Sequence, residues 1–318
     1  MVSEFDFIKN IKAKYGLRGI GDDCAILPKN DESDTVITAD LLVEDIHFRL
    51  NWTSPGLLGA KVLAVSLSDI AAMGAEPTWA MLSFAVTDSV WNSDFLEKFY
   101  EGWFTLARRH NVELVGGDVS RTAGKIVFDS IVGGKVPTGK AILRSGAQVG
   151  DSIFVTGPLG GAAGGLMMLE SGIKYGTADP ARQALITKQL RPVPRIEIGN
   201  QLREAGLVDT MIDLSDGLSS DLRHICNASH VGARLYANDI PICPDLTKIG
   251  VAHDQALTLA LNGGEDFELL FTSKDAEISL PGQSDIYRIG EITANEGVIE
   301  VIGSEEFEVL QPGGYRHF

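Results

Sequence analysis

SPGLLGAKVLAVSLSDIAAMGAEP, residues 54–77, predicts one long helix made mostly of apolar residues. Ser54, which a proline follows, favours the start of a helix, and Gly74, with another proline beyond it, favours its end. The segment WAMLSFAV (79–86) comes next and is typical of a β-strand. Within the helix, Asp69 has apolar neighbours, and burying an unpaired carboxylate there is costly. A metal ion bound to Asp69 would compensate that cost.

Apolar periodicity and turn residues predict a mixture of helices and strands on both sides of this helix. In the first half, the predicted elements are helices 4–13 and 92–109 and strands 24–28, 34–40, 112–118 and 125–134. In the second half, they are strands 152–157, 208–214, 233–237, 267–272, 285–292 and 297–302, a helix ending near residue 170, and helices 180–190, 195–206 and 216–229.

The segment VPTGKAILRSGAQVGD (136–151) contains several glycines and has no clear periodicity, which is typical of a connection between domains. We therefore expect an N-terminal domain of residues 1–137 and a C-terminal domain of residues 138–318. The order of the elements predicts an α/β (α+β) fold in which helices cover sheets.

The chain has 318 residues and a net charge of −16, from 27 basic and 43 acidic residues. Nucleic-acid binding needs a basic surface, so this charge argues against a nucleic-acid partner. No stretch approaches the roughly 18 unbroken apolar residues of a membrane span, and the first residues lack the features of a signal peptide. We expect a cytoplasmic protein with no membrane partner. The three cysteines form no CxxC motif, so we expect them to be small buried apolar residues.

Several acidic residues lie at the edges of apolar elements, usually beside glycine or serine: Asp23, Asp40, Asp69, Asp118, Asp213, Asp216 and Glu265. Capping or turn formation is the ordinary role of an Asp in such a place, and for Asp216 it stays as open as metal binding. The adjacent pair Asp22 and Asp23 is harder to account for, because a turn needs at most one of them. Hard divalent cations such as Mg²⁺ take oxygen ligands and are often shared between carboxylates and substrate phosphates.

The common nucleotide-binding motifs are not present. TAGKI (122–126) lacks the first glycine and the Ser/Thr of a P-loop, and GPLGGAAGG (157–165) lacks the GxGxxG spacing. These glycines favour tight packing of a helix on a strand over dinucleotide binding, which argues against a nicotinamide-dependent oxidoreductase. The protein-kinase motifs are not found either. Phosphate chemistry in this chain would depend on metal ions and on glycine-rich turns.

Eight segments in order carry a resemblance to a known family: GIGDDCAIL (19–27), TADLLVEDIHF (38–48), VSLSDIAAMGAEP (65–77), LVGGDVSRT (114–122), LRSGAQVGD (143–151), IDLSDGLSSDL (212–222), NGGEDFELLFT (262–272) and GGYRHF (313–318). Together they closely resemble the thiamine-monophosphate kinase family, which belongs to the ATP-binding superfamily that includes aminoimidazole ribonucleotide synthetase. The resemblance covers essentially the whole chain.

The resemblance implies a homodimer in which the mixed sheet of each N-terminal domain pairs with that of the partner to form a barrel. It implies a C-terminal α/β domain with a mixed sheet and an active site between the two domains. The implied reaction converts ATP and thiamine monophosphate to ADP and thiamine diphosphate, with several Mg²⁺ ions as cofactors.

The resemblance also implies roles for single residues. The implied metal ligands are Asp23, Thr38, Ala39, Asp40, Asp69, Asp118, Asp213 and Asp216. The implied ATP contacts are Gly117, Asp118, Arg144 and Ser215. The implied contacts to thiamine monophosphate are His47, Glu265 and Tyr315. The neighbouring acids Asp22, Asp45, Asp221 and Asp266 are not expected to bind metal directly, and Asp221 is expected on a solvated helix face.

Three positions depart from the family pattern. The family usually has Ser-Thr-Asp where this chain has Thr38-Ala39-Asp40, so a hydroxyl contact is lost unless the middle residue binds metal through its carbonyl. His110 replaces a common tyrosine, which leaves any ring contact with ATP open. Tyr315 replaces Trp or Phe, and stacking on an aromatic ring survives that change.

The implied acceptor is a phosphate monoester, whose second pKa of about 6 leaves it largely dianionic at neutral pH. It is already a nucleophile and needs no catalytic base, which agrees with the lack of an obvious His–Asp pair in the sequence. The hypothesis is therefore a direct in-line phosphoryl transfer assisted by metal ions, with no residue acting as acid or base.

Alternative roles stay open for single residues and for the whole chain. His47 alone favours a structural role, Arg144 a surface ion pair, Glu265 a turn and Tyr315 packing at the C-terminus. Within the superfamily, a selenophosphate synthetase would use a reactive cysteine, for which Cys24 is the candidate, and a purine-pathway synthetase is a further alternative. A hydrogenase-maturation-type or metal-binding module without kinase activity is the alternative from another class.

Overall fold

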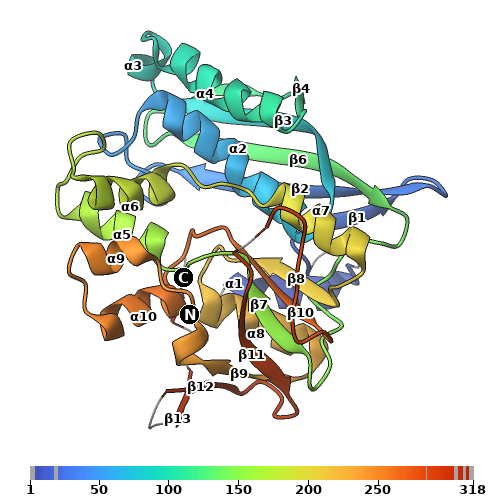
Figure 1. The fold of residues 1–318 in the computed structure, drawn as a ribbon. Coiled ribbons are helices and arrows are strands. Elements are labelled where there is room, and N and C mark those ends of the chain that lie inside the picture. Colours follow the sequence, from blue (N-terminus) through green and yellow to red (C-terminus); the bar gives the residue numbers. More distant parts are fainter. Residues whose placement is uncertain (1–3, 18–20, 284, 304–306, 311–312, 315–318) are drawn as a thin grey trace.

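The computed structural model describes residues 4–17, 21–283, 285–303, 307–310 and 313–314. Two mixed sheets form the framework, one built from the first half of the chain and one from the second (Figure 1). In this view the first sheet lies in the upper part of the molecule and the second in the lower part. The predicted fold class is confirmed by these two mixed sheets with helices packed on them.

The first sheet has the strand order β1-β2-β6-β3-β4, and β5 also pairs with β3. β4 and β5 run parallel to β3, and the other pairs are antiparallel. The strands are β1 (Ala25–Pro28), β2 (Ser33–Val43), β3 (Glu76–Val86), β4 (Glu113–Gly116), β5 (Val119–Arg121) and β6 (Val127–Pro137). Before them comes helix α1 (Glu4–Tyr15).

Helix α2 (Pro55–Ala72) packs on the first sheet and against α4 (Phe95–Arg109), which short α3 (Asp88–Trp91) precedes. Ser54 caps α2 as predicted, because its Oγ accepts a hydrogen bond from Leu57 N at 3.3 Å. By length and composition α2 could cross a membrane, but 72% of that window is buried in this structure. Its apolar composition is that of a core helix covered on all sides.

The second sheet has the strand order β13-β12-β9-β11-β7-β10-β8, in which only β12 and β9 run parallel among the described strands. The strands are β7 (Ser152–Val155), β8 (Thr210–Asp213), β9 (Gly232–Tyr236), β10 (Leu269–Ser273), β11 (Tyr287–Thr293), β12 (Ile299–Ile302) and β13 (Phe307–Val309). The helices are α5 (Gly161–Glu170), α6 (Pro180–Leu190), α7 (Ile196–Ala205), α8 (Leu218–Ser229), η1 (Ala237–Asp239), α9 (Pro244–Lys248) and α10 (His253–Asn262).

One apolar cluster joins the two halves. It contains buried residues of α2, such as Leu67, together with Phe154 of β7 and Phe271 of β10. β6 ends at Pro137 and β7 begins at Ser152, so the connecting segment has no helix or strand. The domain boundary between residues 137 and 138 stays a prediction.

The glycine-rich segment after β7 behaves as a packing element. A Cβ at Gly165 of α5 would lie 2.2 Å from the carbonyl oxygen of Leu185 in α6. A Cβ at Gly164 would lie 2.6 Å from a methyl carbon of Leu246. These glycines therefore allow close packing of α5 on α6 and α9, whereas the sequence predicted packing of a helix on a strand.

The contact between α2 and α4 depends on glycine in the same way. A Cβ at Gly102 would lie 1.8 Å from the carbonyl oxygen of Gly56, and one at Gly59 would lie 2.0 Å from that of Phe99. Backbone meets backbone here, so no side chain can move aside. We expect Gly102→Ala to reduce the free energy of unfolding by at least about 1–3 kcal/mol, the usual cost of overpacking.

Thermal unfolding monitored by circular dichroism checks this prediction. Gly124→Ala is the matched control, because a Cβ there meets its nearest atom, Thr122 Oγ1, at 3.8 Å. If Gly102→Ala and Gly124→Ala unfold at the same temperature, the close helix contact does not exist in solution.

Candidate active site

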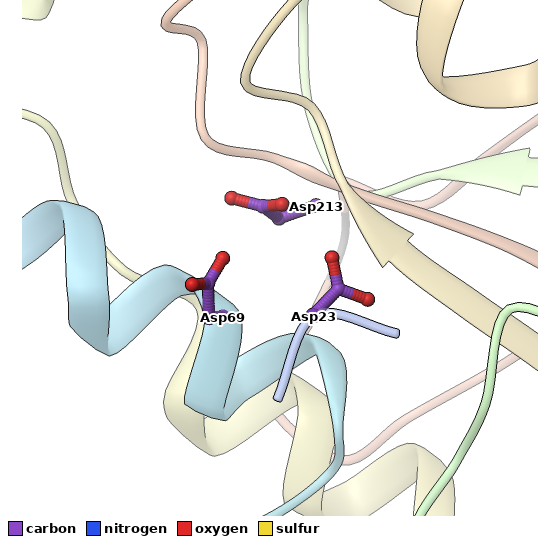
Figure 2. A group of neighbouring side chains, drawn as sticks. All are labelled: Asp23, Asp69 and Asp213. Atoms are coloured by element: carbon purple, nitrogen blue, oxygen red, sulfur yellow. The ribbon is translucent and has the colours of Figure 1, made fainter. Parts of the chain in front are cut away.

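Three carboxylates from distant parts of the chain meet between the two halves (Figure 2). Asp23 precedes β1, Asp69 lies near the end of α2, and Asp213 is the last residue of β8. One carboxylate oxygen from each residue lies within 4.8 Å of the others. All three side chains point toward one another from separate elements (Figure 2).

Strand β2 adds two further predicted ligands beside this group. Thr38 Oγ1 donates a hydrogen bond to Asp69 Oδ2. The charge of Asp40 raises the pKa of Asp69, in addition to the larger effect of burial. Because side chains alternate along a strand, Ala39 faces the opposite side of the sheet, where it is exposed. Ala39 can therefore contribute only backbone atoms to any site.

Burial is the largest cause of the raised pKa values of these carboxylates. Burial raises the pKa of Asp40 to about 6 and that of Asp213 to about 7, and the neighbouring charge of Asp23 adds to the effect at Asp213. Burial also raises the pKa values of Asp23 and Asp69, against the opposing effect of Arg144 at Asp23. Like charges held together in a low-dielectric region destabilise one another.

The donor set of the group suits a hard cation. The Oδ2 atoms of Asp23, Asp40 and Asp213 are buried and have no hydrogen-bond partner among the described residues. A buried oxygen without a donor is costly, and for a carboxylate the cost is greater. Clustered carboxylate oxygens are the ligands of Mg²⁺ and similar ions, so these residues fit a bound divalent cation.

Asp22 and Asp23 both bind Arg144, one through its backbone and the other through its side chain. Asp23 Oδ1 accepts a hydrogen bond from Arg144 Nη2 at 2.6 Å, in a largely buried ion pair. Asp22 Oδ1 accepts one from the backbone nitrogen of Arg144 at 2.8 Å. Both acids therefore fix the segment that connects the two sheets, and the guanidinium of Arg144 is brought to the carboxylate group.

Gly117 and Asp118 lie between β4 and β5. Gly117 has a φ of +150°, and a Cβ there would lie 1.9 Å from the carbonyl oxygen of Leu82, so only glycine suits this position. The backbone oxygen of Asp118 accepts a hydrogen bond from Phe84 N at 2.9 Å, and its exposed side chain lies outside the group of three carboxylates.

The segment that follows β8 carries Ser215 and Asp216, and it meets the segment that carries Glu265. Ser215 O accepts a hydrogen bond from Glu265 N at 2.8 Å. Glu265 Oε2 lies 2.9 Å from Lys61 Nζ in an ion pair. Helix α8 begins at Leu218 with Gly217 at the N-cap position, so Asp216 lies just before the helix.

His47 follows β2. Its Nδ1 accepts a hydrogen bond from the backbone nitrogen of Val43 at 2.9 Å, so the ring proton of the neutral form lies on Nε2. A hollow of about 530 Å³ is lined by neighbouring residues of this segment: Glu44, Asp45, Arg49, Leu50 and Asn51. Tyr315 lies outside the described residues, and so does Gly19.

The expectation for Asp221 was wrong. Its side chain is buried, and Oδ2 accepts hydrogen bonds from the backbone nitrogens of Asp216 at 3.2 Å and Gly217 at 3.0 Å. The helical period predicted a solvated face, but the turn before α8 folds over that face and needs an acceptor. Asp266 is similar, because its partly buried carboxylate accepts hydrogen bonds from Gly160 N and Ala162 N at the start of α5.

Cys24 is 4% exposed, and burial followed by the charge of Asp69 raises the pKa of its thiol well above the ordinary value. A thiol in that state is a poor nucleophile. The geometry therefore disfavours a reaction that uses Cys24 as the reactive group, as the selenophosphate synthetase alternative requires.

The sequence reasoning missed Lys61. A lysine in the middle of an apolar helix was the signal that could have indicated it, because a buried ammonium needs anionic or carbonyl partners. In the structure Lys61 is 3% exposed and pairs with Glu265.

Comparisons with known proteins show to which family the chain belongs. Residues 21–136 match the model "AIR synthase related protein, N-terminal domain", and residues 148–303 match "AIR synthase related protein, C-terminal domain". The chain is 39% identical to a thiamine-monophosphate kinase of Escherichia coli (strain K12), over 99% of this chain and 95% of that protein. It is 34% identical to one of Bacillus subtilis (strain 168), over 100% of both chains.

A solved structure gives the same result. The structure described as "AaThiL complexed with AMPPCP and TMP" superimposes with a TM-score of 0.89 at 30% sequence identity. The match covers 100% of this chain and 97% of that one. The resemblance read from the eight segments is thereby confirmed at the level of the family.

The raised pKa values predict a pH-dependent stability in the presence of a chelator. Asp40 and Asp213 have folded pKa values of about 6 and about 7, against ordinary values of 3.8. The folded state therefore binds more protons than the unfolded state between about pH 4 and pH 7, and its stability decreases as the pH rises through that window. We expect the Tm in EDTA to be several degrees lower at pH 8 than at pH 5.

Differential scanning calorimetry of Asp213→Asn tests the cause of that change. The variant should have a higher Tm than the wild type in EDTA at pH 8, and a smaller loss between pH 5 and pH 8. Asp94→Asn is the control, because Asp94 is exposed and pairs with Lys98 on the surface. Equal pH dependence in Asp213→Asn and the wild type would contradict the assignment.

Proposed function

The chain belongs to the thiamine-monophosphate kinase family of AIR synthase related proteins, and from this we propose that it transfers the γ-phosphoryl group of ATP to thiamine monophosphate, giving ADP and thiamine diphosphate. The main support is that the carboxylates of Asp23, Asp69 and Asp213 lie close together. All three residues belong to the part of the chain that is similar to these kinases. A structural relative that holds AMPPCP, an ATP analogue, and TMP supports both substrates.

The carboxylates of the site would hold Mg²⁺ ions. This proposal is supported by the buried Oδ2 atoms of Asp23, Asp40 and Asp213, which have no hydrogen-bond partner among the described residues. The proposed ligands are Asp23, Asp40, Asp69, Asp118, Asp213 and Asp216, with Thr38 through its hydroxyl and Ala39 through its backbone. When bound, Mg²⁺ offsets phosphate charge and orients the transferred group.

Further residues of the chain would bind the two substrates. Gly117 is exposed and has no side chain of its own, so a phosphate could approach its backbone. Arg144 offers a planar fork of donors, which suits phosphate oxygens. Ser215 also belongs to the proposed ATP site, and His47, Glu265 and Tyr315 are the proposed contacts to thiamine monophosphate.

The transfer itself needs orientation more than proton movement. An oxygen of the thiamine monophosphate phosphate attacks the γ-phosphorus, the bond from the γ-phosphorus to the bridging oxygen breaks, and ADP leaves with that electron pair. Both phosphates are already ionised at neutral pH, so no residue removes a proton. The residues of the site hold the reacting oxygens in line and reduce their mutual repulsion. A phosphorylated enzyme trapped on the reaction path would contradict this direct transfer.

A second copy of the chain would cover the open face of the first sheet. α2 and α4 pack on one face, and on the other Leu41 is 57% and Met81 38% exposed. The strand register places Ala39, Ile131 and Met81 in one cross-strand row. In the next row Leu41 lies beside Asp129 and Ser83, so the face carries exposed apolar side chains next to polar ones. Exposed apolar side chains rimmed by polar residues are typical of a protein interface. We also propose the cytoplasmic location expected from the sequence, because the reaction consumes ATP.

An assay of purified protein with Mg²⁺, ATP and thiamine monophosphate tests the proposed function, with thiamine and an aminoimidazole substrate as controls. We expect thiamine diphosphate only with thiamine monophosphate. Asp69→Asn should lower kcat by about 10²–10³-fold, the usual loss when one preorganised electrostatic group is removed. The variant should stay folded, because Asn fills the same space.

Asp94→Asn is the control for that variant, since it removes an exposed carboxylate at the start of α4. It should have wild-type activity. Wild-type protein that forms no thiamine diphosphate would overturn the proposed function, and an active Asp69→Asn would overturn the role of the carboxylate group.

The dimer is tested by Leu41→Glu, which places a charge on the open sheet face. We expect wild-type protein to have twice the 34.1 kDa mass of the chain in light scattering after gel filtration, and the variant to have the mass of one chain. Val309→Glu is the control, because Val309 is 43% exposed on β13 at the edge of the other sheet. A monomeric wild type would exclude this interface.

A further inference from the structure

Lys61 is a buried lysine with no role in the reaction described above. It lies in α2, two helical turns before Asp69, and its side chain is 3% exposed. Burying an ammonium group is costly unless it is paired and hydrogen-bonded. The residues that pair with Lys61 therefore indicate the role of this buried lysine.

Both partners of Lys61 lie in the second half of the chain. Its Nζ donates to Glu265 Oε2 at 2.9 Å and to the backbone oxygen of Gln189 at 3.1 Å. The side-chain nitrogen of Gln189 donates to the same Glu265 Oε2. Among the described residues, both donors to the Glu265 carboxylate therefore bind Oε2, and none donates a hydrogen bond to Oε1.

The backbone around Glu265 is also held in an unusual conformation. Glu265 has a φ of +67° and Phe267 a φ of +50°, which residues other than glycine rarely adopt. Hydrogen bonds from Glu265 N to Ser215 O, at 2.8 Å, and from Phe267 N to Leu214 O, at 2.9 Å, fix this segment beside the end of β8. Such conformations persist only where the surroundings fix them, and they concentrate at functional sites.

We propose that Lys61 and Gln189 are positioning residues that hold Glu265 as an ionised acceptor for thiamine monophosphate, with Oε2 fixed and Oε1 left for the substrate. This inference rests on the proposed function. Thiamine monophosphate has an anionic phosphate at one end and a cationic, amine-bearing ring system at the other, and a carboxylate suits the second end. Lys61 and Asp69 are eight residues apart, which is about 12 Å along a helix axis. Helix α2 thereby places Lys61, which holds Glu265 for the ring end of the substrate, apart from Asp69, which belongs to the carboxylate group at the phosphate end.

A purely structural bridge between the two halves is the alternative. It predicts a loss of stability without a specific effect on one substrate, because breaking a buried ion pair destabilises the fold. A positioning role predicts that the KM for thiamine monophosphate changes, while the KM for ATP and kcat change little. Since Lys61 acts through Glu265, its effect should vanish once Glu265 no longer carries the charge.

Steady-state kinetics of Lys61→Met, Glu265→Gln and the double variant make this test. We expect Lys61→Met to raise the KM for thiamine monophosphate about 10–100-fold, the range for residues that orient a binding group, with kcat and the KM for ATP within about threefold of wild type. In the Glu265→Gln background the same substitution should add less than about threefold. Lys98→Met, an exposed lysine of α4, is the matched control and should have wild-type kinetics.

Gln189→Leu decides the matter if Lys61→Met does not fold, because it removes one donor to Oε2 and leaves Lys61 in place. It should raise the KM for thiamine monophosphate severalfold without a change in kcat. A wild-type KM for thiamine monophosphate in the folded Lys61 or Gln189 variant, or additive effects in the double variant, overturns the inference alone. Wild-type protein that forms no thiamine diphosphate overturns the proposed function and this inference together.

Discussion

The constraint on which this structure depends is the burial of several carboxylates within a few ångströms of one another. Asp23, Asp69 and Asp213 come from three separate segments, and their oxygens converge within 4.8 Å (Figure 2). Burial and mutual repulsion both oppose this arrangement, as the raised pKa values of these groups show. The surrounding packing must therefore impose it, and a bound cation would remove most of its cost.

Helix α2 is the element that imposes it. The helix is buried against the first sheet, α4 and α7, and its glycine contact with α4 leaves no room for a different crossing. It carries Asp69 near one end and Lys61 two turns earlier, so one rigid element fixes both a carboxylate of the group and the partner of Glu265. Because Asp213 and Glu265 belong to the second half, α2 also joins the two halves at the site.

Local patterns in the sequence predicted much of this. Ser54 and Gly74 bounded α2, and the interior position of Asp69 indicated a charge that needed compensation. What they could not predict depends on tertiary contacts. Asp221 is buried because a turn folds over its helix, and the exposure of Ala39 follows from which face of β2 the helices cover. Short elements such as β5 and α9 were missed because they are too short to show a period.

The charge of the site determines how its ligands must influence one another. Without cations, a group of buried carboxylates, of which Asp23 is paired with Arg144, repels a polyphosphate, and the net charge of −16 adds to the repulsion. With divalent cations, the sign of the local potential is reversed. Each bound cation then raises the affinity for phosphate, and by thermodynamic linkage each bound phosphate raises the affinity for the cation by the same factor. If the site holds divalent cations as proposed, the metal and phosphate ligands of this acidic protein would therefore bind cooperatively.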